Sequence, residues 1–529
     1  MSGWDVVKRA INSNLELPLD VWMKECNGIA PNNMKYFNIT QGVDHANIYF
    51  VEPDDTIIDG NTLCMVAGIK IMRKDTGYPN TPDAGIEVAD IKRSEFGKYG
   101  KLAYKDTTVN SGKGYYYTAF PYSYNGVYNM NPVNINHAFV MIRDYELYGY
   151  DVDPDDSDPG TRVSYPKDVD NYGFSPITVN LNNGSYDTGS WGDTFMLKKI
   201  RPVMLKYTGE VDYELNHYDQ NFKLDGSASD VSNKSYAGNA MVEFPKMYFY
   251  RYEGTDGKHH VRISNKKINN NYKCYQHMYN GREVDTIYLP MYEGSMVDTK
   301  VRSLAGQRPC ANTTGAAELA AIKLNGAGWQ FDDWINTMMV QDLMFMCGKS
   351  TDVQSIYGNG HSEGWTEYSD CLLNTGTTTT KGMFFGKNTT NEAVKVFFLE
   401  NYYGDRWDRK FGGKYSTSGE ILFHAYPPYE DASFIDTGIT LEGNGTTGGF
   451  ISKTKVTEYG TFPAETKGSS STFMPDGCWH DTNDEAFLLW GSGCTDSVRV
   501  GCAVNLNLPF SGAWGNLGPS LAYKNPKAA

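Results

Sequence analysis

The stretch FLLWGSGCTDSVRVGCAVNLNLPFSGAWGNLGPSLAY, from Phe487 to Tyr523, decides the fold class that the sequence predicts. Residues 504–508 of it read Val-Asn-Leu-Asn-Leu, in which every second side chain points the same way if the segment is a strand. Glycine recurs between 491 and 518 too often for long strands and is typical of turns there. We therefore expect short strands that display a surface built from loops.

The two faces of this predicted strand differ in chemistry. The Val and Leu side chains favour a core, whereas Asn505 and Asn507 each carry a donor and an acceptor and suit a solvent-facing recognition surface. Aromatic rings nearby stack on apolar ligand faces, and Asp and Arg supply oriented hydrogen bonds. The candidate ligand-binding residues are Trp490, Asp496, Arg499, Asn505, Asn507, Phe510 and Trp514. For Trp490 and Trp514 a place in the core is the alternative, and Asn505 has the alternative of only satisfying backbone groups.

Several segments upstream carry a resemblance to a known family. They are MVEFPKMYFYRYEGTDGKHHVRISNKK (241–267), GREVDTIYLPMYEG (281–294), GWQFDDWINTMMVQDLMFMCGKSTDVQSIYGNG (328–360) and FLENYYGDRWDRKFGG (398–413). With NLNL and WGNLGPSLAY of the terminal stretch, and in the same order, they resemble the C-type-lectin-like domains that close many bacteriophage tail and fibre proteins. Receptor-binding tropism proteins are among these. The match is also similar, more remotely, to formylglycine-generating-enzyme-like folds.

The resemblance and the strand pattern together predict a multidomain, mainly β chain. The resemblance implies an α+β C-type-lectin-like domain over residues 236–529. Residues 31–235 alternate β-branched and aromatic runs with Gly, Pro, Asn and Asp clusters, which predicts one or two β-sandwich-like units that serve for attachment. The polar stretch from Asn216 to Gly238 is the predicted linker.

The first 30 residues form a predicted anchor segment. Ser2 can cap a short helix, Val7 and Ile11 fall four apart, and Pro18 would stop it. Such a short segment has no core of its own, so its apolar face must be buried on its own domain, on other subunits or on a virion partner. The predicted anchor residues are Trp4, Val7, Ile11 and Trp22.

A second helix is predicted over about 332–347. Asp332 or Asp333 would cap it, and Gly348 would end it. Its apolar positions are rich in methionine, which indicates a core helix rather than a cofactor site.

Charge and composition limit the partners. The net charge of −15, with no cluster of Lys and Arg, argues against nucleic acid as a ligand. The sequence has no run of about 18 apolar residues, so we predict no membrane insertion. We expect the chain in a virion, as a tail or head fibre assembled in the host cytoplasm, although an ordinary cytosolic protein would share these features.

Cysteine and metal chemistry are not favoured by the sequence. Nine cysteines, an odd number without a CxxC pair, indicate mostly reduced apolar residues. The formylglycine-generating resemblance implies paired cysteines at Cys494 and Cys502, but seven residues intervene here against four in that family, so a disulfide and inert thiols both stay open. The acidic run 151–160 fails the calcium-loop pattern, since Asp156 and Arg162 stand where Gly and Glu are needed. We predict no cofactor, no metal and no enzyme.

The resulting prediction is a bacteriophage virion structural protein, a tail fibre or receptor-binding protein. Its N-terminal part would attach to other virion proteins, and its C-terminal lectin-like loops would bind a host cell-surface receptor, either glycan or protein. The resemblance implies a homotrimer. One alternative is a head fibre or tail decoration protein with a structural role only. Another is a surface-polysaccharide depolymerase, whose pair of facing carboxylates no sequence argument can choose.

Overall fold

The computed structural model describes residues 29–42, 44–58, 61–98, 104–364, 366, 371–429, 433–441, 445–470, 474–483, 485–494 and 501–526. Within them the chain is mainly β and forms several sheets, as the sequence predicted. It divides into two compact units, Met1–Glu146 and Leu147–Ala529. The predicted anchor residues Trp4, Val7, Ile11 and Trp22 lie outside the described residues.

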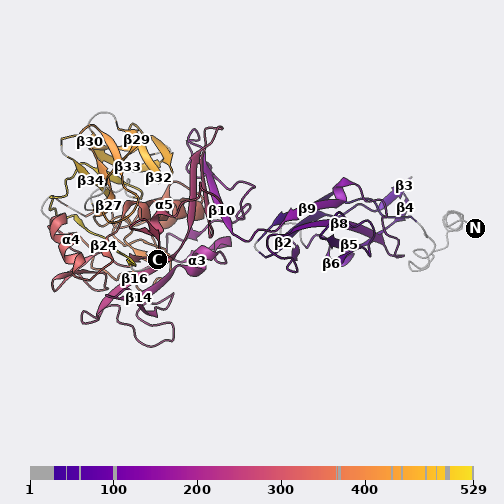
Figure 1. Cartoon of the computed structure of the whole chain (residues 1–529), viewed down its shortest axis with the longest axis horizontal. Helices are drawn as coiled ribbons and strands as arrows, with labels where there is room; N and C mark the ends of the chain where they lie inside the picture. Colours follow the sequence, from indigo (N-terminus) through magenta and orange to yellow (C-terminus); the bar gives the residue numbers. More distant parts are fainter. Residues whose placement is uncertain are drawn as a thin grey trace, which may run out of the picture. The chain divides into compact units, whose positions relative to one another are not determined.

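The first unit is a β-sandwich (Figure 1). One antiparallel sheet has the order β1-β2-β7, the other β6-β5-β8-β9, and apolar side chains from both sheets meet in one core. Strand β2 alternates, with Ala46, Ile48 and Phe50 buried, as expected for a sheet with one covered face. The elements are β1 (Tyr36–Gln41), β2 (Ala46–Val51), β3 (Thr56–Ile58), β4 (Asn61–Cys64), β5 (Val66–Lys74), β6 (Ile86–Lys92), η1 (Arg93–Glu95), β7 (Tyr104–Asp106), β8 (Gly114–Ser123), η2 (Asn134–Asn136) and β9 (His137–Met141).

A buried ion pair joins the two sheets of this sandwich. Arg73 on β5 donates to Asp106 on β7 at 2.5 Å, and the hydroxyl of Tyr117 on β8 donates to the same carboxylate at 2.9 Å. Burial raises the pKa of Asp106, but hydrogen bonds from Thr108 and Tyr117 and the charge of Arg73 outweigh it and hold that pKa below its ordinary value. The carboxylate therefore stays charged and partnered inside the sandwich.

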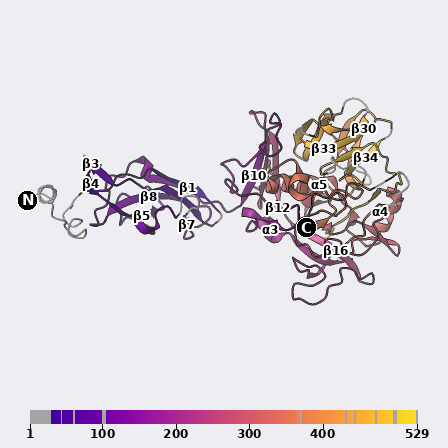
Figure 2. The same cartoon turned by 180° about the vertical axis from the view of Figure 1, so that it is seen from behind.

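The second unit contains a four-stranded and a six-stranded antiparallel sheet (Figure 2), built mainly from strands of its first half, with β24 and β37 added from later in the chain. Their orders are β11-β10-β18-β17 and β15-β14-β16-β21-β37-β24. The elements up to the first long helix are β10 (Leu147–Val152), β11 (Val163–Ser164), β12 (Thr178–Val179), β13 (Tyr186–Asp187), η3 (Gly189–Trp191), α3 (Phe195–Lys199), β14 (Arg201–Lys206), β15 (Val211–Glu214), β16 (Gly238–Pro245), β17 (Tyr248–Glu253), β18 (His259–Ser264), η4 (Tyr275–His277), β19 (Met278–Tyr279), β20 (Arg282–Glu283), β21 (Thr286–Pro290), β22 (Ser295–Val297) and β23 (Lys300–Arg302).

The predicted boundary at residue 235 differs from the structure. The polar stretch connects β15 to β16, and both of these strands pair with β14, with Val203 of β14 opposite Met241 of β16. The stretch is therefore a connection within one sheet. The observed division falls between Glu146 and Leu147 instead. Turn residues in the sequence mark that stretch as a loop, but they do not show that its flanking strands belong to the same sheet.

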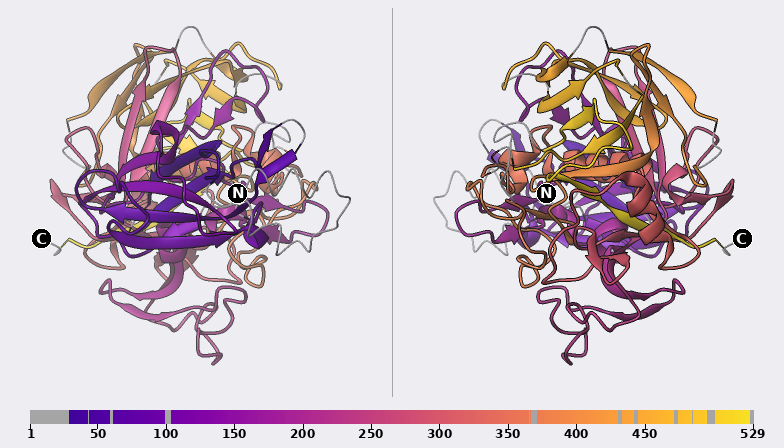
Figure 3. Two further views of the ribbon diagram at one scale, coloured as in Figure 1. Left: turned by 90° about the vertical axis from the view of Figure 1, so that its right-hand side faces the viewer. Right: turned by 90° about the vertical axis from the view of Figure 1, so that its left-hand side faces the viewer.

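The second half of this unit builds a larger sheet with the order β29-β28-β27-β34-β35-β33-β30, and β36 pairs with β27 in parallel. Figure 3 shows these strands in orange and yellow. The elements are α4 (Gly315–Lys323), β24 (Trp329–Phe331), α5 (Trp334–Gly348), α6 (Val353–Tyr357), β25 (Lys395–Val396), β26 (Leu399–Glu400), β27 (Trp407–Tyr415), β28 (Glu420–Phe423), β29 (Ile435–Thr440), β30 (Gly445–Ile451), β31 (Lys453–Thr457), β32 (Gly460–Glu465), β33 (Met474–His480), β34 (Ala486–Trp490), β35 (Val504–Leu506), β36 (Leu517–Pro519) and β37 (Leu521–Lys524).

The predicted methionine-rich helix is confirmed as α5, which is buried along its whole length. Asp333 caps it by accepting from the amide of Asn336 at 3.1 Å. Its internal carboxylate, Asp342, is paired with Arg251 at 2.7 Å. The helix ends one residue later than predicted, since Gly348 is still helical and Lys349 takes the left-handed conformation with φ 53°. Among the helices of the described residues, none is long and apolar enough to cross a membrane.

Candidate functional site

The stretch that decides the predicted fold forms short strands in the structure, β34 to β37. Its last strand, β37, lies between β21 and β24 in the six-stranded sheet. Lys524 on β37 pairs with Asp333 at 2.7 Å, and both side chains are fully buried. The C-terminal strand is therefore tied to the N-terminus of the central helix by a buried charge pair.

Asn505 does not face solvent, contrary to the prediction. Strand β35 lies between β34 and β33, so both of its edges are paired. On the side of Asn505 a small apolar cluster of Trp407, Leu489, Ala503 and Leu517 covers the sheet. The Asn505 side chain, 7% exposed, accepts from the amide of Asn507 at 2.9 Å. It stabilises the exit from the strand instead of offering a contact to a ligand.

Trp490 is likewise a core residue. Its side chain is 0% exposed, and its indole NH donates to the carbonyl of Tyr402 at 3.1 Å. Its ring meets that of Trp334 on α5 edge to face, with 5.9 Å between centroids. Of its two interpretations from the sequence, the structure supports the core.

The segment from Asn507 to Asn516, called here the terminal loop, carries the remaining described candidates. Trp514 is 41% exposed. Phe510 is half-buried and packs on Phe487 with 4.6 Å between ring centroids. Asn507 is also partly buried, and its Oδ1 has no hydrogen-bond partner among the described residues. The terminal loop thus places one exposed ring beyond an apolar base.

The backbone of the terminal loop is attached to the segment that leads into α4. The amide of Asn312 donates to the carbonyl of Trp514 at 2.9 Å, and the amide of Gly315 donates to that of Phe510 at 3.0 Å. Gly315 is required by packing, because a Cβ there would lie 2.3 Å from the Phe510 ring. The loop is therefore held along its length and not only at its ends.

Two buried arginines lie on and beside β27, and one of them, Arg409, holds the terminal loop. Arg409 donates to the carbonyl of Gly512 and pairs with Glu318 on α4. Burial raises the pKa of Glu318, and the charge of Arg409 opposes that rise. Arg406 donates to the carbonyls of Cys310 and Pro519, each at 2.7 Å. Since both guanidiniums are at most 1% exposed, they are structural donors to backbone and not ligand contacts.

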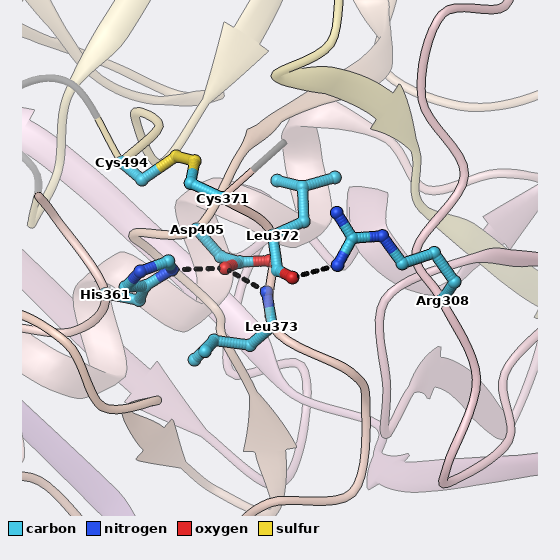
Figure 4. Close-up of a disulfide and its surroundings, with 7 residues drawn as sticks. All are labelled: Arg308, His361, Cys371, Leu372, Leu373, Asp405 and Cys494. Atoms are coloured by element: carbon cyan, nitrogen blue, oxygen red, sulfur yellow. Dashed lines mark hydrogen bonds and ion pairs between the residues drawn. A yellow bond between two sulfur atoms is a disulfide. The ribbon is translucent and has the colours of Figure 1, made fainter. Parts of the chain in front are cut away.

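A disulfide between Cys371 and Cys494 lies near a buried His–Asp pair (Figure 4). The carboxylate of Asp405 contacts His361 Nδ1 at 2.5 Å and accepts from the amide of Leu373 at 2.9 Å. The amide of Cys494 in turn donates to the carbonyl of Asp405 at 3.1 Å. The prediction that most cysteines are reduced is confirmed, since six of the described cysteines are free and buried, and Cys371 and Cys494 are the described pair that is oxidised.

Asp496 and Arg499, two further candidates, lie outside the described residues, but both flanks of their segment are fixed. On one side stands the disulfide of Cys494. On the other, Asp476 on β33 accepts backbone hydrogen bonds from Gly501 and Cys502. Burial, reinforced by the nearby charge of Asp352, raises the pKa of Asp476 to about 7.

The structure does not pair Cys494 with Cys502. Cys502 is a free thiol, and burial raises its pKa well above the ordinary value. A thiol of that kind is a poor nucleophile at neutral pH. The arrangement implied by the formylglycine-generating resemblance is therefore not present at these two residues.

The acidic run at residues 151–160 forms turns in the structure. Asp153, Asp156 and Asp158 each accept a hydrogen bond from a backbone amide two residues further on. Lys258 pairs with Asp153 at 2.9 Å. Over the described part of the chain, no group of three or more His, Cys, Asp or Glu side chains is placed to hold a metal ion.

Sequence reasoning missed Arg409, which holds the terminal loop, Asp476, which holds Gly501 and Cys502, and the buried Arg406. The sequence carries a signal for the two arginines, which fall within four residues of each other in a segment that otherwise resembles a buried strand. A buried arginine needs hydrogen-bond acceptors, so such a pair indicates a network of backbone or side-chain partners. Asp476 gave no such signal, since one acid among 63 cannot be singled out.

Comparison with known proteins found no family model that matches the chain and no curated protein that matches it.

Proposed function

We propose that this chain is a bacteriophage virion protein that binds the host cell surface through its terminal loop. In this proposal the second unit contains a C-type-lectin-like domain, and the N-terminal region attaches to other virion proteins. A homotrimer would present several copies of the loop, so that weak single contacts add up through effective concentration.

One observation carries the proposal. Trp514 is 41% exposed on a loop whose backbone is bound by Arg409, Asn312 and Gly315. An exposed indole on a preorganised backbone loses little conformational freedom on binding, which is the property that recognition surfaces use.

The chemistry around Trp514 favours a glycan or a protein surface with both apolar and polar groups. The indole provides a flat apolar face and one NH donor. The Oδ1 of Asn507 is buried, so the exposed indole is the group on this loop that a ligand would meet. Such a ring can stack on the apolar face of a sugar, which has hydroxyls at its edge.

The proposal is tested by competition with intact particles. Purified full-length chain, added before particles that contain it, should block their adsorption to the bacterial strain on which they propagate. The Trp514→Ala chain should fail to block adsorption. The control is Tyr218→Ala, which removes a 74% exposed aromatic ring elsewhere in the same unit and should block as the unaltered chain does.

Two results would count against this function. If Trp514→Ala blocks as well as the unaltered chain, the terminal loop is not the contact surface. If antibodies raised against the purified chain do not label the particles by electron microscopy, the chain is not a virion protein.

A further inference from the structure

An open cleft on the second unit stands apart from the terminal loop. Its volume is about 790 Å³. It lies between α3, which packs against β16 (Figure 1), and the turn at residues 265–267 after β18. The ends of β14, β16 and β21 form its floor. All of its lining residues fall between 195 and 286, so it shares no residue with the terminal loop.

The cleft is basic, although the chain is acidic. Six of its lining residues are Lys or Arg and three are Asp or Glu, whereas the whole chain has a net charge of −15. Basic residues gathered in a hollow of an acidic protein concentrate the positive potential there.

Two of these basic residues form ion pairs with acidic residues on the floor of the cleft. Arg201 binds both carboxylate oxygens of Glu243, at 3.0 and 3.1 Å, and also Glu214 at 3.0 Å. Lys246 pairs with Asp285 at 2.9 Å. These pairs fix the shape of the floor and leave it close to neutral.

The rim is different. Lys199 at the end of α3 and Lys267 in the turn opposite are both exposed, and neither forms an ion pair with any part of the chain that the structure describes. Two such cations on opposite walls of a cleft attract an anion that lies between them. No acidic side chain of the described residues satisfies them, so a ligand would not have to displace one.

We propose that this cleft binds a carboxylated polysaccharide. The volume fits several sugar rings, and the two lysines provide cations for carboxylates spaced along a chain. Tyr248 adds an aromatic surface, and the carboxylate of Asp285, 95% exposed, is an acceptor for sugar hydroxyls. A ligand with sparse charge and many hydroxyls needs this mixture of cations, acceptors and an aromatic ring.

Nucleic acid fits the cleft less well. A strand with one charge per nucleotide requires a continuous basic track, and a binding site typically neutralises about 6–10 phosphates. Here six basic residues line the hollow, and Arg201 and Lys246 are already paired with its three acidic residues, so no continuous basic track is left for a dense row of phosphates. The charge pattern therefore favours a sparsely charged polysaccharide over nucleic acid.

The test is a titration of full-length chain against a fluorescent oligogalacturonate decamer, followed by anisotropy at low salt and at physiological salt. A neutral dextran oligosaccharide and a single-stranded DNA decamer serve as the other probes. The cleft variant is Lys199→Gln with Lys267→Gln. The matched control is Lys105→Gln with Lys234→Gln, which removes two exposed lysines that do not line the cleft.

We expect saturable binding of oligogalacturonate that weakens as salt rises, and no binding of dextran. The cleft variant should raise the Kd about tenfold, and the control should leave it unchanged. Three results would overturn the proposal: no saturable binding of oligogalacturonate, equal Kd values for the cleft variant and the control, or binding of DNA alone. Trp514→Ala should not change this Kd, so the outcome is independent of the function proposed for the terminal loop.

Discussion

The guanidinium of Arg409 donates a hydrogen bond to the carbonyl oxygen of Gly512, two residues before the exposed Trp514. Arg409 is 1% exposed and also pairs with Glu318 on α4. A charge inside the fold thus holds the backbone of a loop at the surface. Arg409 fixes the position of the loop, and Trp514 supplies the chemistry that a ligand would meet.

Substitutions at Arg409 should show separately what this residue contributes to the stability of the fold and to the position of the loop. Arg409→Leu leaves the buried Glu318 without its partner, so we expect the free energy of unfolding to fall by about 3–5 kcal/mol. Arg409→Leu combined with Glu318→Leu removes both charges and should recover most of that loss. Denaturant titration measures both. A double variant as unstable as the single one would show that the uncompensated carboxylate is not the cause.

The double variant also tests the loop directly. It retains the fold but lacks the hydrogen bond to Gly512, so Trp514 should become more mobile. Its tryptophan fluorescence should be quenched more by acrylamide than that of the unaltered chain, with Trp514→Ala chains as the baseline. Equal quenching would mean that Asn312 and Gly315 hold the loop without Arg409.

The disulfide between Cys371 and Cys494 should be a measurable source of stability. Cross-links that close long loops constrain the unfolded chain, and here the two cysteines are 123 residues apart. We expect Cys371→Ser with Cys494→Ser to lower the free energy of unfolding by about 2–4 kcal/mol. A reductant should lower the Tm of the unaltered chain and leave that of the variant unchanged. If the Tm of the unaltered chain does not change when reductant is added, the disulfide between Cys371 and Cys494 is not present.

Asp476 should make stability depend on pH. Burial raises its pKa to about 7 in the folded chain, against the ordinary value of 3.8. Between these two values the folded state binds the proton and the unfolded state does not, so this residue lowers stability as pH rises from about 4 to 7. Asp476→Asn keeps an acceptor for Gly501 and Cys502 but cannot ionise.

The measurement is the free energy of unfolding of both chains from pH 5 to 8. Stability of Asp476→Asn relative to the unaltered chain should increase by roughly 1.4 kcal/mol per pH unit up to about pH 7, and then level off. A difference that does not change with pH would show that Asp476 titrates normally.

Truncation of the two tryptophans of the terminal stretch should lower stability by very different amounts. Trp490→Ala opens a cavity in the core and should cost about 3–5 kcal/mol of stability. Trp514→Ala removes a partly exposed ring and should cost about 1 kcal/mol or less. Thermal unfolding of the two variants compares them. A large loss from Trp514→Ala would mean that its ring is part of the packing and not a free surface.

The sequence predicts local structure well where the cause is local. Helix α5 follows from the capping Asp333 and a periodic run of methionine and leucine, and both features lie within the helix itself. The β-sandwich of the first unit follows from alternating apolar residues such as Ala46, Ile48 and Phe50. In each case the residues that determine the structure are neighbours in the chain.

The sequence fails where the cause is a partner far along the chain. Asn505 alternates with apolar residues as a solvent-facing residue would, but a cluster that includes Trp407 covers it from almost one hundred positions away. The disulfide is of the same kind, because no spacing rule joins Cys371 to Cys494. The sequence also does not show that the strands on either side of the polar stretch, β15 and β16, both pair with β14, since strand partners depend on the whole sheet.

The most direct test of the central claim is an adsorption isotherm of fluorescent full-length chain on cells of the bacterial strain that supports the particles. We predict saturable adsorption by the unaltered chain and by Tyr218→Ala, and at least a tenfold loss of affinity for Trp514→Ala while circular dichroism stays unchanged. Equal adsorption by all three chains, or no saturable adsorption by the unaltered one, would contradict recognition of the host surface by the terminal loop.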